Sequence, residues 1–299
     1  GYSKSTYISL KDSSVVTTGN NSAGTAVSAR AMMKVENSTV STTGDSSPAI
    51  MIADGGGILI ADGGSFTTSG AMSQGIYSKG DVTVTNASVN ALNAKAAVLK
   101  GNNTITLSGT ILEGKETTDA VPYNIVLFSD EKDIGTMGTQ HFDVRGGSLI
   151  SHKGGMFYVT ATHGKISLNG TAITMDDPAA NLITVAGNDG ANGWGTPGRN
   201  GGHVELVADN QILTGNISVD SISNINMTLK NNSTFNGMIS IVPNAEGGEK
   251  YKTNADVFIA AGSTWNLTGN STLTSLYNLG TINYNGYTIT LADGTVMEA

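Results

Sequence analysis

One short apolar pattern recurs along this chain and restricts what the chain can fold into. Two apolar residues stand two positions apart, a polar turn follows, and a third apolar residue stands seven positions after the first, as in Val82, Val84 and Val89. A period of two places apolar side chains on one face of a strand and polar ones on the other. The pattern therefore predicts short strands joined by tight turns. Further copies are Ile8, Leu10 and Val15; Met33, Val35 and Val40; Ile105, Leu107 and Leu112; Phe142, Val144 and Leu149; and Ile166, Leu168 and Ile173, with Ile58, Ile60 and Phe66 as a looser copy.

A second apolar stretch lies between successive copies, for example at 26–29, 49–53 and 75–78, and these stretches begin 21 to 32 residues apart. That spacing is typical of one coil of a parallel β-helix, and parallel crossovers are nearly always right-handed. We therefore predict an all-β fold, a right-handed single-stranded parallel β-helix with three short strands per coil and roughly 10–12 coils. The residues expected to point inward include Ile8, Leu10, Val82, Val84, Ile105, Leu107, Ile166 and Leu168.

Two other all-β folds fit the pattern less well. A β-sandwich would show hairpin turns every 8–12 residues or so, and few Asn-Gly pairs are present. A left-handed β-helix would need a regular hexapeptide repeat, which is missing. No stretch has sustained helical spacing of apolar residues.

We expect residues 1–299 to form one β-helix domain with two loop insertions. The segment 188–202 consists almost entirely of turn-forming residues, and the segment 243–256 interrupts the pattern in the same way. Strand-like copies resume after each segment, and no linker separates the two halves.

The composition narrows the class of protein. Charged residues make up 13% of the chain, against about 25% in an average soluble protein, so the polar surface consists of Ser, Thr, Asn and Gly. The formal net charge of −8 argues against binding nucleic acid, which needs a basic surface. Since the chain has no Cys, disulfides and thiolate chemistry are excluded. It has no apolar run long enough to span a membrane, and we interpret it as a fragment of an exported protein.

Several segments carry a resemblance to a known family. SPAIMIADGG at 47–56, GIYSKGDVTVTNASV at 75–89, and WGTPGRNGG at 194–202 followed by VELVADNQILTGNIS are similar to adhesin-like parallel β-helix proteins exported by gut bacteria. More distantly, they resemble pertactin-like passenger domains of autotransporters. The resemblance covers nearly the whole chain and is carried by coil residues. It implies a location outside the cell or on the bacterial surface, and a role in adhesion.

From these observations we expect an adhesin-like structural or binding module that contacts a host or environmental glycan or a surface protein. We expect a monomer with no bound cofactor. Recognition is expected in the 188–202 loop, where Trp194 and Arg199 combine an aromatic ring with a cation. The alternative for Trp194 is that it fills an irregular coil where the two halves meet.

The competing function is a carbohydrate-active enzyme of the lyase or glycoside hydrolase type, because enzymes also use this fold. Asp54, Asp62 and Asp81 lie near predicted turns, and Asp130–Glu131 and Asp176–Asp177 are adjacent acidic pairs. Turn formation accounts for these residues, so we assign no catalytic residue. His141, His152 and His163 recur every 11 residues, but residues aligned on neighbouring coils are farther apart in sequence, so we predict no metal site.

Overall fold

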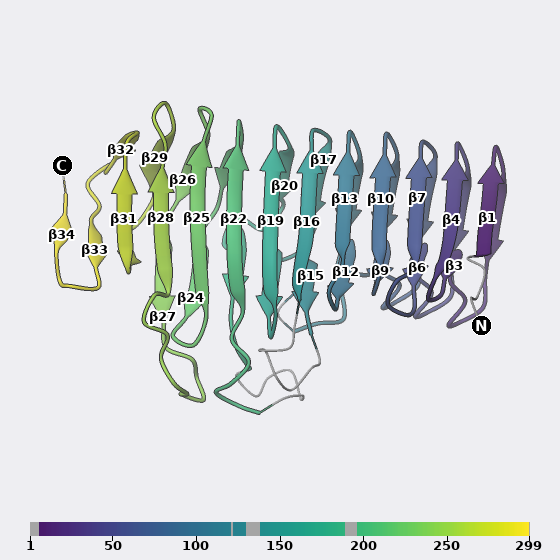
Figure 1. Ribbon diagram of the computed structural model, residues 1–299, viewed down its shortest axis with the longest axis horizontal. Helices are drawn as coiled ribbons and strands as arrows, with labels where there is room; N and C mark the ends of the chain where they lie inside the picture. Colours follow the sequence, from purple (N-terminus) through teal and green to yellow (C-terminus); the bar gives the residue numbers. More distant parts are fainter. Residues whose placement is uncertain (1–5, 121, 130–137, 189–195, 299) are drawn as a thin grey trace. The chain divides into compact units, whose positions relative to one another are not determined.

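In the computed structural model, residues 6–120, 122–129, 138–188 and 196–298 are described. Their regular structure consists of β-strands alone (Figure 1). No helix in these ranges is long and apolar enough to cross a membrane. The sheets are long and parallel, with strands of successive coils side by side. The predicted right-handed parallel β-helix is confirmed.

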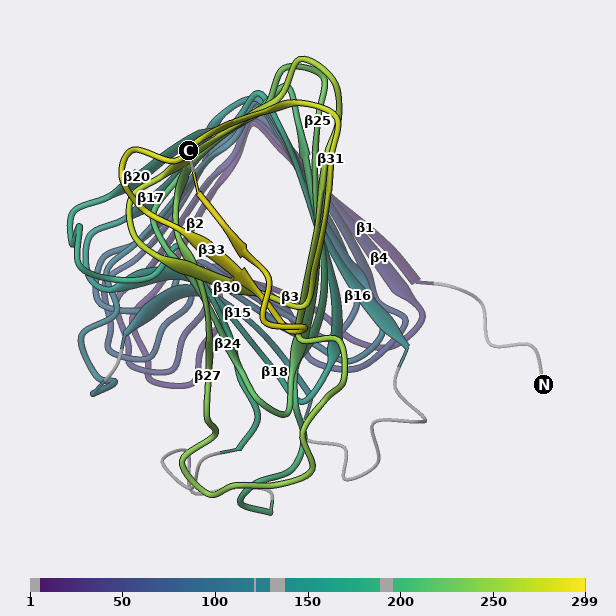
Figure 2. The same ribbon diagram turned by 90° about the vertical axis from the view of Figure 1, so that its left-hand side faces the viewer.

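The chain divides into two compact units, and each is described by itself. The first contains Gly1–Val126, Gln140–Met156 and Thr174–Asp177, and the second contains Leu127–Thr139, Phe157–Ile173 and Pro178–Ala299. Whether 1–299 behaves as one domain therefore stays a prediction. Seen along the direction of stacking, the coils of each unit superimpose on one another (Figure 2).

In the first unit, each coil contributes one strand to each of three parallel sheets. The first sheet contains β1 (Thr6–Lys11), β4 (Ala31–Glu36), β7 (Ile58–Asp62), β10 (Asp81–Thr85), β13 (Thr104–Ser108) and β16 (Thr139–Arg145). The second contains β2 (Ser14–Thr17), β5 (Thr39–Thr42), β8 (Ser65–Thr68), β11 (Ser88–Ala91), β14 (Ile111–Gly114) and β17 (Ser148–Ser151). The third contains β3 (Thr25–Val27), β6 (Ile50–Ile52), β9 (Ile76–Ser78) and β12 (Ala97–Lys100). The strands β15 (Tyr123–Phe128), β18 (Gly155–Thr160) and β20 (Ala172–Met175) have residues in both units, and so does β16, whose first residue, Thr139, belongs to the second unit.

The second unit repeats this plan. Its first sheet contains β19 (His163–Asn169), β22 (His203–Asp209), β25 (Asn224–Lys230), β28 (Ala255–Ile259) and β31 (Ser275–Asn278). A second sheet contains β23 (Ile212–Thr214), β26 (Thr234–Gly237), β29 (Thr264–Leu267) and β32 (Thr281–Asn283). The third-sheet strands are β21 (Ile183–Val185), β24 (Ile217–Asp220) and β27 (Ile239–Val242). At the end, β30 (Ser271–Leu273) pairs with β33 (Ile289–Leu291), which forms an antiparallel pair with β34 (Val296–Met297).

The core is built from ladders of aligned apolar residues. Val82 lies between Leu59 of the preceding coil and Ile105 of the following coil, and all three are buried. Because every coil repeats the same register, each apolar side chain packs against its counterpart one coil away. Six of the eight residues predicted to point inward are fully buried, namely Val82, Val84, Ile105, Leu107, Ile166 and Leu168.

The turn after each first strand explains the spacing of the repeat. The residue midway through this turn has a positive φ, with values of 47° at Asp12, 51° at Asn86 and 57° at Gly109. Gly, Asn and Asp tolerate this left-handed conformation best. The turn therefore lies four positions after the first apolar residue and three before the last. The other residues at this position are Asn37, Gly63, Gly146, Gly170, Asn210 and Asn231.

Two details of the predicted core are wrong. The inward residues of the looser copy are Leu59, Ala61 and Phe66, all buried, whereas Ile58 is 37% exposed. These three residues restore the regular spacing of two and seven positions, which was hidden because Ala61 is a small apolar residue. Ile8 is 48% exposed. It is aligned with Met33 in the inward ladder. Its strand, β1, is at the end of the sheet, so within the described residues no preceding coil covers Ile8.

Candidate functional site

Two long loops of the second unit lie at the same corner of the coils. Each leads into the first-sheet strand of its coil. One loop runs from the end of β21 to His203, the first residue of β22, and the other runs from the end of β27 to Ala255, the first residue of β28. Between them lies β25, which pairs with both β22 and β28. The turn that leads into β25 is short, because β24 ends at Asp220 and β25 begins at Asn224. Two long loops flanking a short turn leave a groove with that turn at its base.

The groove has a volume of about 770 Å³, within the usual range for ligand pockets. Residues 197–201 and His203 line one side, residues 248–253 line the other, and Ile222 of the short turn lies between them. Figure 1 shows the described parts of both loops below the first sheet. Residues 197–201 of the first predicted interruption and 248–253 of the second thus come together in space.

The buried carboxylate of Asp220 binds both loops close to the strands that they follow. Only 4% of Asp220 is exposed, and its Oδ2 accepts hydrogen bonds from the backbone N–H of Gly187 at 2.8 Å and from Asn244 Nδ2 at 2.6 Å. The other oxygen accepts from the N–H of Ile222 at 3.2 Å. Charge-assisted hydrogen bonds of this kind are among the stronger ones. Since the two loops and the short turn share one acceptor, the groove is built in advance of any ligand.

The second loop is tied to the short turn at two more points. Asn254 Nδ2 donates to the carbonyl oxygen of Ser223 at 2.7 Å, and the N–H of Tyr251 donates to the carbonyl oxygen of Ser221 at 2.8 Å. The two loops also meet directly, because a Cβ added to Gly248 would lie 2.0 Å from the carbonyl oxygen of Gly198. With φ at 102° and 71°, Gly248 and Gly198 both need the freedom of glycine.

A column of three rings borders the groove. His163 and His203 are aligned on neighbouring strands and stack with ring centroids 4.7 Å apart. The ring of Tyr251 also lies against His203, with centroids 4.9 Å apart and the two ring planes tilted by 55°. His203 and Tyr251 line the groove, and Tyr251 is 41% exposed. The column presents an aromatic edge to any bound molecule.

His203 is held in its neutral form. Burial lowers the pKa of its imidazole, and the neighbouring His163 lowers it further, against the opposing effect of a hydrogen bond with Asn224. The bond joins Nδ1 of His203 and Oδ1 of Asn224 at 3.0 Å. An amide oxygen only accepts, so Nδ1 carries the hydrogen and Nε2 is left as an acceptor. The central ring of the column is therefore uncharged at neutral pH.

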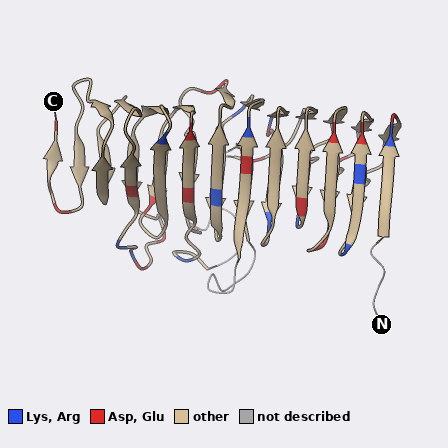
Figure 3. Cartoon of the chain, turned by 45° about the horizontal axis from the view of Figure 1, so that its top comes forward, with Lys and Arg blue, Asp and Glu red and all other residues tan. Residues whose placement is uncertain are grey.

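The charged residues of the groove are mostly cations. Arg199, Lys250 and Lys252 line it together with one carboxylate, Glu249. Within the described ranges, none of these three cations forms an ion pair. The chain as a whole has a net charge of −8, and its strands carry few charges (Figure 3). The groove is thus a local concentration of positive charge on an acidic protein.

Of the two residues predicted for recognition, the structure places Arg199 in the groove, while Trp194 lies outside the described residues. The sequence prediction missed His203 and Tyr251. The signal for Tyr251 was present, since Lys250, Tyr251 and Lys252 place an aromatic residue between two cations in a polar loop. His203 gave no such signal, because its stacking partner depends on the register across a long loop.

A second polar cluster lies in the first unit, around His152. Its Nε2 lies 2.5 Å from Oε1 of Glu113, and its Nδ1 lies 2.8 Å from Oδ2 of Asp176. Hydrogen bonds with Asp176 and with Glu113 raise the pKa of His152. Since both ring nitrogens are occupied and the carboxylates lie on opposite sides of the ring, the cluster links three coils. It does not leave an acid and a base facing a common substrate.

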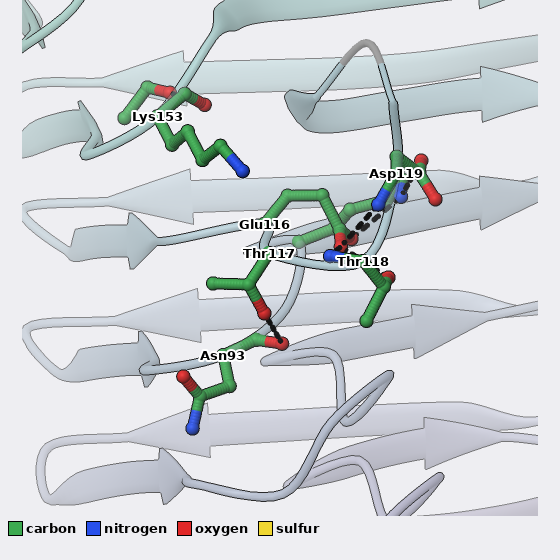
Figure 4. Close-up of polar contacts among 8 residues, drawn as sticks. Asn93, Glu116, Thr117, Thr118, Asp119 and Lys153 are labelled. Carbon is green, nitrogen blue, oxygen red and sulfur yellow. Dashed lines mark hydrogen bonds and ion pairs between the residues drawn. The ribbon is translucent and has the colours of Figure 1, made fainter.

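The loop after β14 holds a third cluster, in which Glu116 is 3% exposed. Its carboxylate accepts a hydrogen bond from Lys95 at 2.7 Å and others from the backbone and hydroxyl of Thr118. Figure 4 shows the bonds that Glu116 accepts from the backbone of Thr118 and Asp119, beside the bond from the hydroxyl of Thr117 to the carbonyl of Asn93. Burial opposes ionisation, but the bonds from Lys95 and Thr118 outweigh it and lower the pKa of Glu116 to about 2. This buried ion pair anchors the loop.

Two of the carboxylates considered for catalysis, Asp81 and Asp176, are already bonded within the fold. Oδ1 of Asp81 accepts from the backbone N–H of Thr104 at 2.9 Å, which joins two coils. Asp62 ends β7, aligned with Glu36 and Thr85, and the pair Asp130–Glu131 lies outside the described residues. In the part of the chain that the structure describes, no three His, Asp or Glu side chains are arranged to hold a metal ion.

No protein-family model, no curated protein and no solved structure matches this chain.

Proposed function

We propose that this chain is an adhesin-like binding module of an exported protein, and that it binds a glycan or a surface protein in the groove between residues 197–203 and 248–253. The observation that carries the proposal is the meeting of the two long loops across the short turn at Ile222. Loops on a rigid scaffold are where binding residues most often lie. The coils supply such a scaffold, because their side chains are already engaged in ladders.

A location outside the cell or on the bacterial surface accompanies this proposal. A hydroxyl- and amide-rich surface with 13% charged residues and no Cys suits an extended β protein that is stabilised by its core alone. We propose that the coils act as the stalk that carries the groove.

The groove favours binding over hydrolysis. A glycoside hydrolase generally needs two carboxyl groups on either side of the bond to be cleaved, and Glu249 is the one carboxylate among the described lining residues. His203, the nearest candidate base, is bonded through Nδ1 to an amide and not to a carboxylate. Hydrogen-bonding groups, cations and an aromatic edge are what a binding site requires.

A glycan array probed with the wild-type protein and with Tyr251→Ala tests the proposal. Tyr277→Ala is the matched control, because Tyr277 is also exposed and also stacks on an aromatic residue, Phe258, but lies outside the groove. We expect Tyr251→Ala to abolish binding that Tyr277→Ala leaves intact. Binding that survives Tyr251→Ala, or an array without any bound glycan, would contradict a glycan-binding groove.

A further inference from the structure

The geometry points to an acidic saccharide as the ligand of the groove, that is, a glycan whose pyranose rings carry carboxylate or sulfate groups. This inference rests on the proposed binding function and specifies the chemical class of its ligand. It follows from the charges of the groove, from its column of rings and from its size.

The charge of the groove is opposite to that of the protein. Three of its lining residues are cations, Arg199, Lys250 and Lys252, against the single carboxylate of Glu249. Elsewhere in the second unit, lysines are neutralised locally, as in the pairs Lys165–Glu205 at 2.9 Å and Lys230–Asp209 at 3.4 Å. The groove cations have no such partner among the described residues, so they are available to an anionic ligand. Their guanidinium and ammonium groups donate strong hydrogen bonds to carboxylate and sulfate oxygens.

The ring column supplies the second element that a saccharide needs. Tyr251 is 41% exposed, and its ring packs against His203, which in turn stacks on His163. An aromatic face offers an apolar surface to the C–H side of a sugar ring at little cost in conformational entropy. Because the pKa of His203 is lowered, this ring is neutral at ordinary pH, and the charged groups of the ligand are left to the cations.

The size of the groove selects a short segment of an extended ligand. A volume of about 770 Å³ is open to solvent between two loops, which suits a few sugar units of a longer chain. Three cations are too few to follow the backbone of a nucleic acid on a protein with a net charge of −8. A carboxylated or sulfated saccharide matches the charge, the aromatic edge and the size together.

Isothermal titration calorimetry with defined tetrasaccharides tests the inference. The probes are α-1,4-linked tetragalacturonate, the same tetrasaccharide with its carboxyl groups methyl-esterified, and a sulfated tetrasaccharide. The variants are Arg199→Gln and Lys252→Gln, with Lys230→Gln as the control, because Lys230 is an exposed lysine of the same unit outside the groove. Circular dichroism checks that each variant is folded.

We expect the wild-type protein to bind at least one acidic tetrasaccharide, with an affinity that falls at high salt. Arg199→Gln and Lys252→Gln should each weaken binding about tenfold, the effect of losing one charge-assisted hydrogen bond, whereas Lys230→Gln should not. Preference for the carboxylated or for the sulfated probe identifies which anion the groove accepts.

Equal binding of the esterified and the acidic tetragalacturonate would overturn the inference and leave the proposed glycan-binding function in place. Acidic saccharides that bind with unchanged affinity to both groove variants would overturn it as well, because the cations would then not be the recognition groups. Failure of every saccharide, acidic or neutral, to bind would overturn the inference together with a glycan-binding groove, and a surface protein would remain as the proposed ligand.

Discussion

Tyr251 lies against His203 with ring centroids 4.9 Å apart, although His203 begins β22 and Tyr251 lies in the loop before β28, with β25 between these two strands. The contact exists because both loops leave the solenoid at the same corner, and the short turn at 221–223 leaves room for them to approach. It couples an exposed aromatic residue to the regular ladder through His163. The groove is therefore a part of the coil architecture and not an isolated surface feature.

The register of the core predicts unequal effects at neighbouring positions of β13. Leu107 is fully buried between Val84 and Val144, so Leu107→Asp would bury an unpaired charge and should cost several kcal/mol. Ser108 points outward, and Ser108→Asp should change stability by less than about 0.5 kcal/mol. Thermal unfolding of the two variants measures the difference. Equal shifts in melting temperature would show that the assigned register is wrong.

The left-handed turn predicts that Asn86 tolerates glycine better than alanine. With φ at 51°, Asn86 occupies a conformation that costs an L-residue such as alanine about 1–2 kcal/mol. Asn86→Ala should therefore lower the free energy of unfolding by about that amount, and Asn86→Gly should be less harmful. Denaturant unfolding of both variants provides the comparison. A larger loss for the glycine variant would argue against a conformational role for this position.

The His152 cluster predicts a loss of stability on the alkaline side. The pKa of the His152 imidazole is raised in the folded protein above the ordinary value of 6.5. A group whose pKa is raised by folding adds stability that is complete below its unfolded pKa and is lost as pH rises through the folded pKa. The melting temperature should therefore fall as pH rises from about 6.5 through the folded pKa. In His152→Gln this part of the pH dependence should vanish. A melting temperature that rises over this window in the wild-type protein would be inconsistent with the bonds to Glu113 and Asp176.

The shared acceptor at the feet of the loops predicts that Asp220 controls the groove. Asp220→Ala removes the acceptor of the Gly187, Asn244 and Ile222 bonds and leaves buried donors unpaired, which costs about 1–3 kcal/mol for each group. Faster hydrogen exchange at Gly187 and across 244–253 is the expected result, together with weaker ligand binding. Asp209→Ala serves as the control, since Asp209 pairs with Lys230 on the outer surface. Unchanged exchange in Asp220→Ala would mean that the loops are held by other contacts.

Much of the fold follows from the sequence because a solenoid repeats one local rule. The spacing seen in Val82, Val84 and Val89 is dictated by two inward positions on a strand and a left-handed turn at Asn86, all within a few residues of each other. The rule failed where residue size disguised it, at Ala61, and where the stack ends, at Ile8.

The site was predicted in part, for a related reason. The loops at 188–202 and 243–256 were visible as interruptions of the repeat, and Arg199 was identified in the first of them. The stacking of His163 on His203 was not visible, since the loop between them lengthens the coil and hides the register. The sequence suggested comparing His163 with His141 and His152, but His141 aligns with Thr104 and His152 binds two carboxylates.

Hydrogen–deuterium exchange tests most directly whether recognition occurs in the groove. It is measured with and without the glycan that binds most tightly on the array. We predict that the ligand slows exchange at 196–203 and 246–253, on both sides of the groove, and leaves the first sheet of the first unit unchanged. Slowed exchange along the outer strands β7, β10 and β13, with no change in the two loops, would contradict the account.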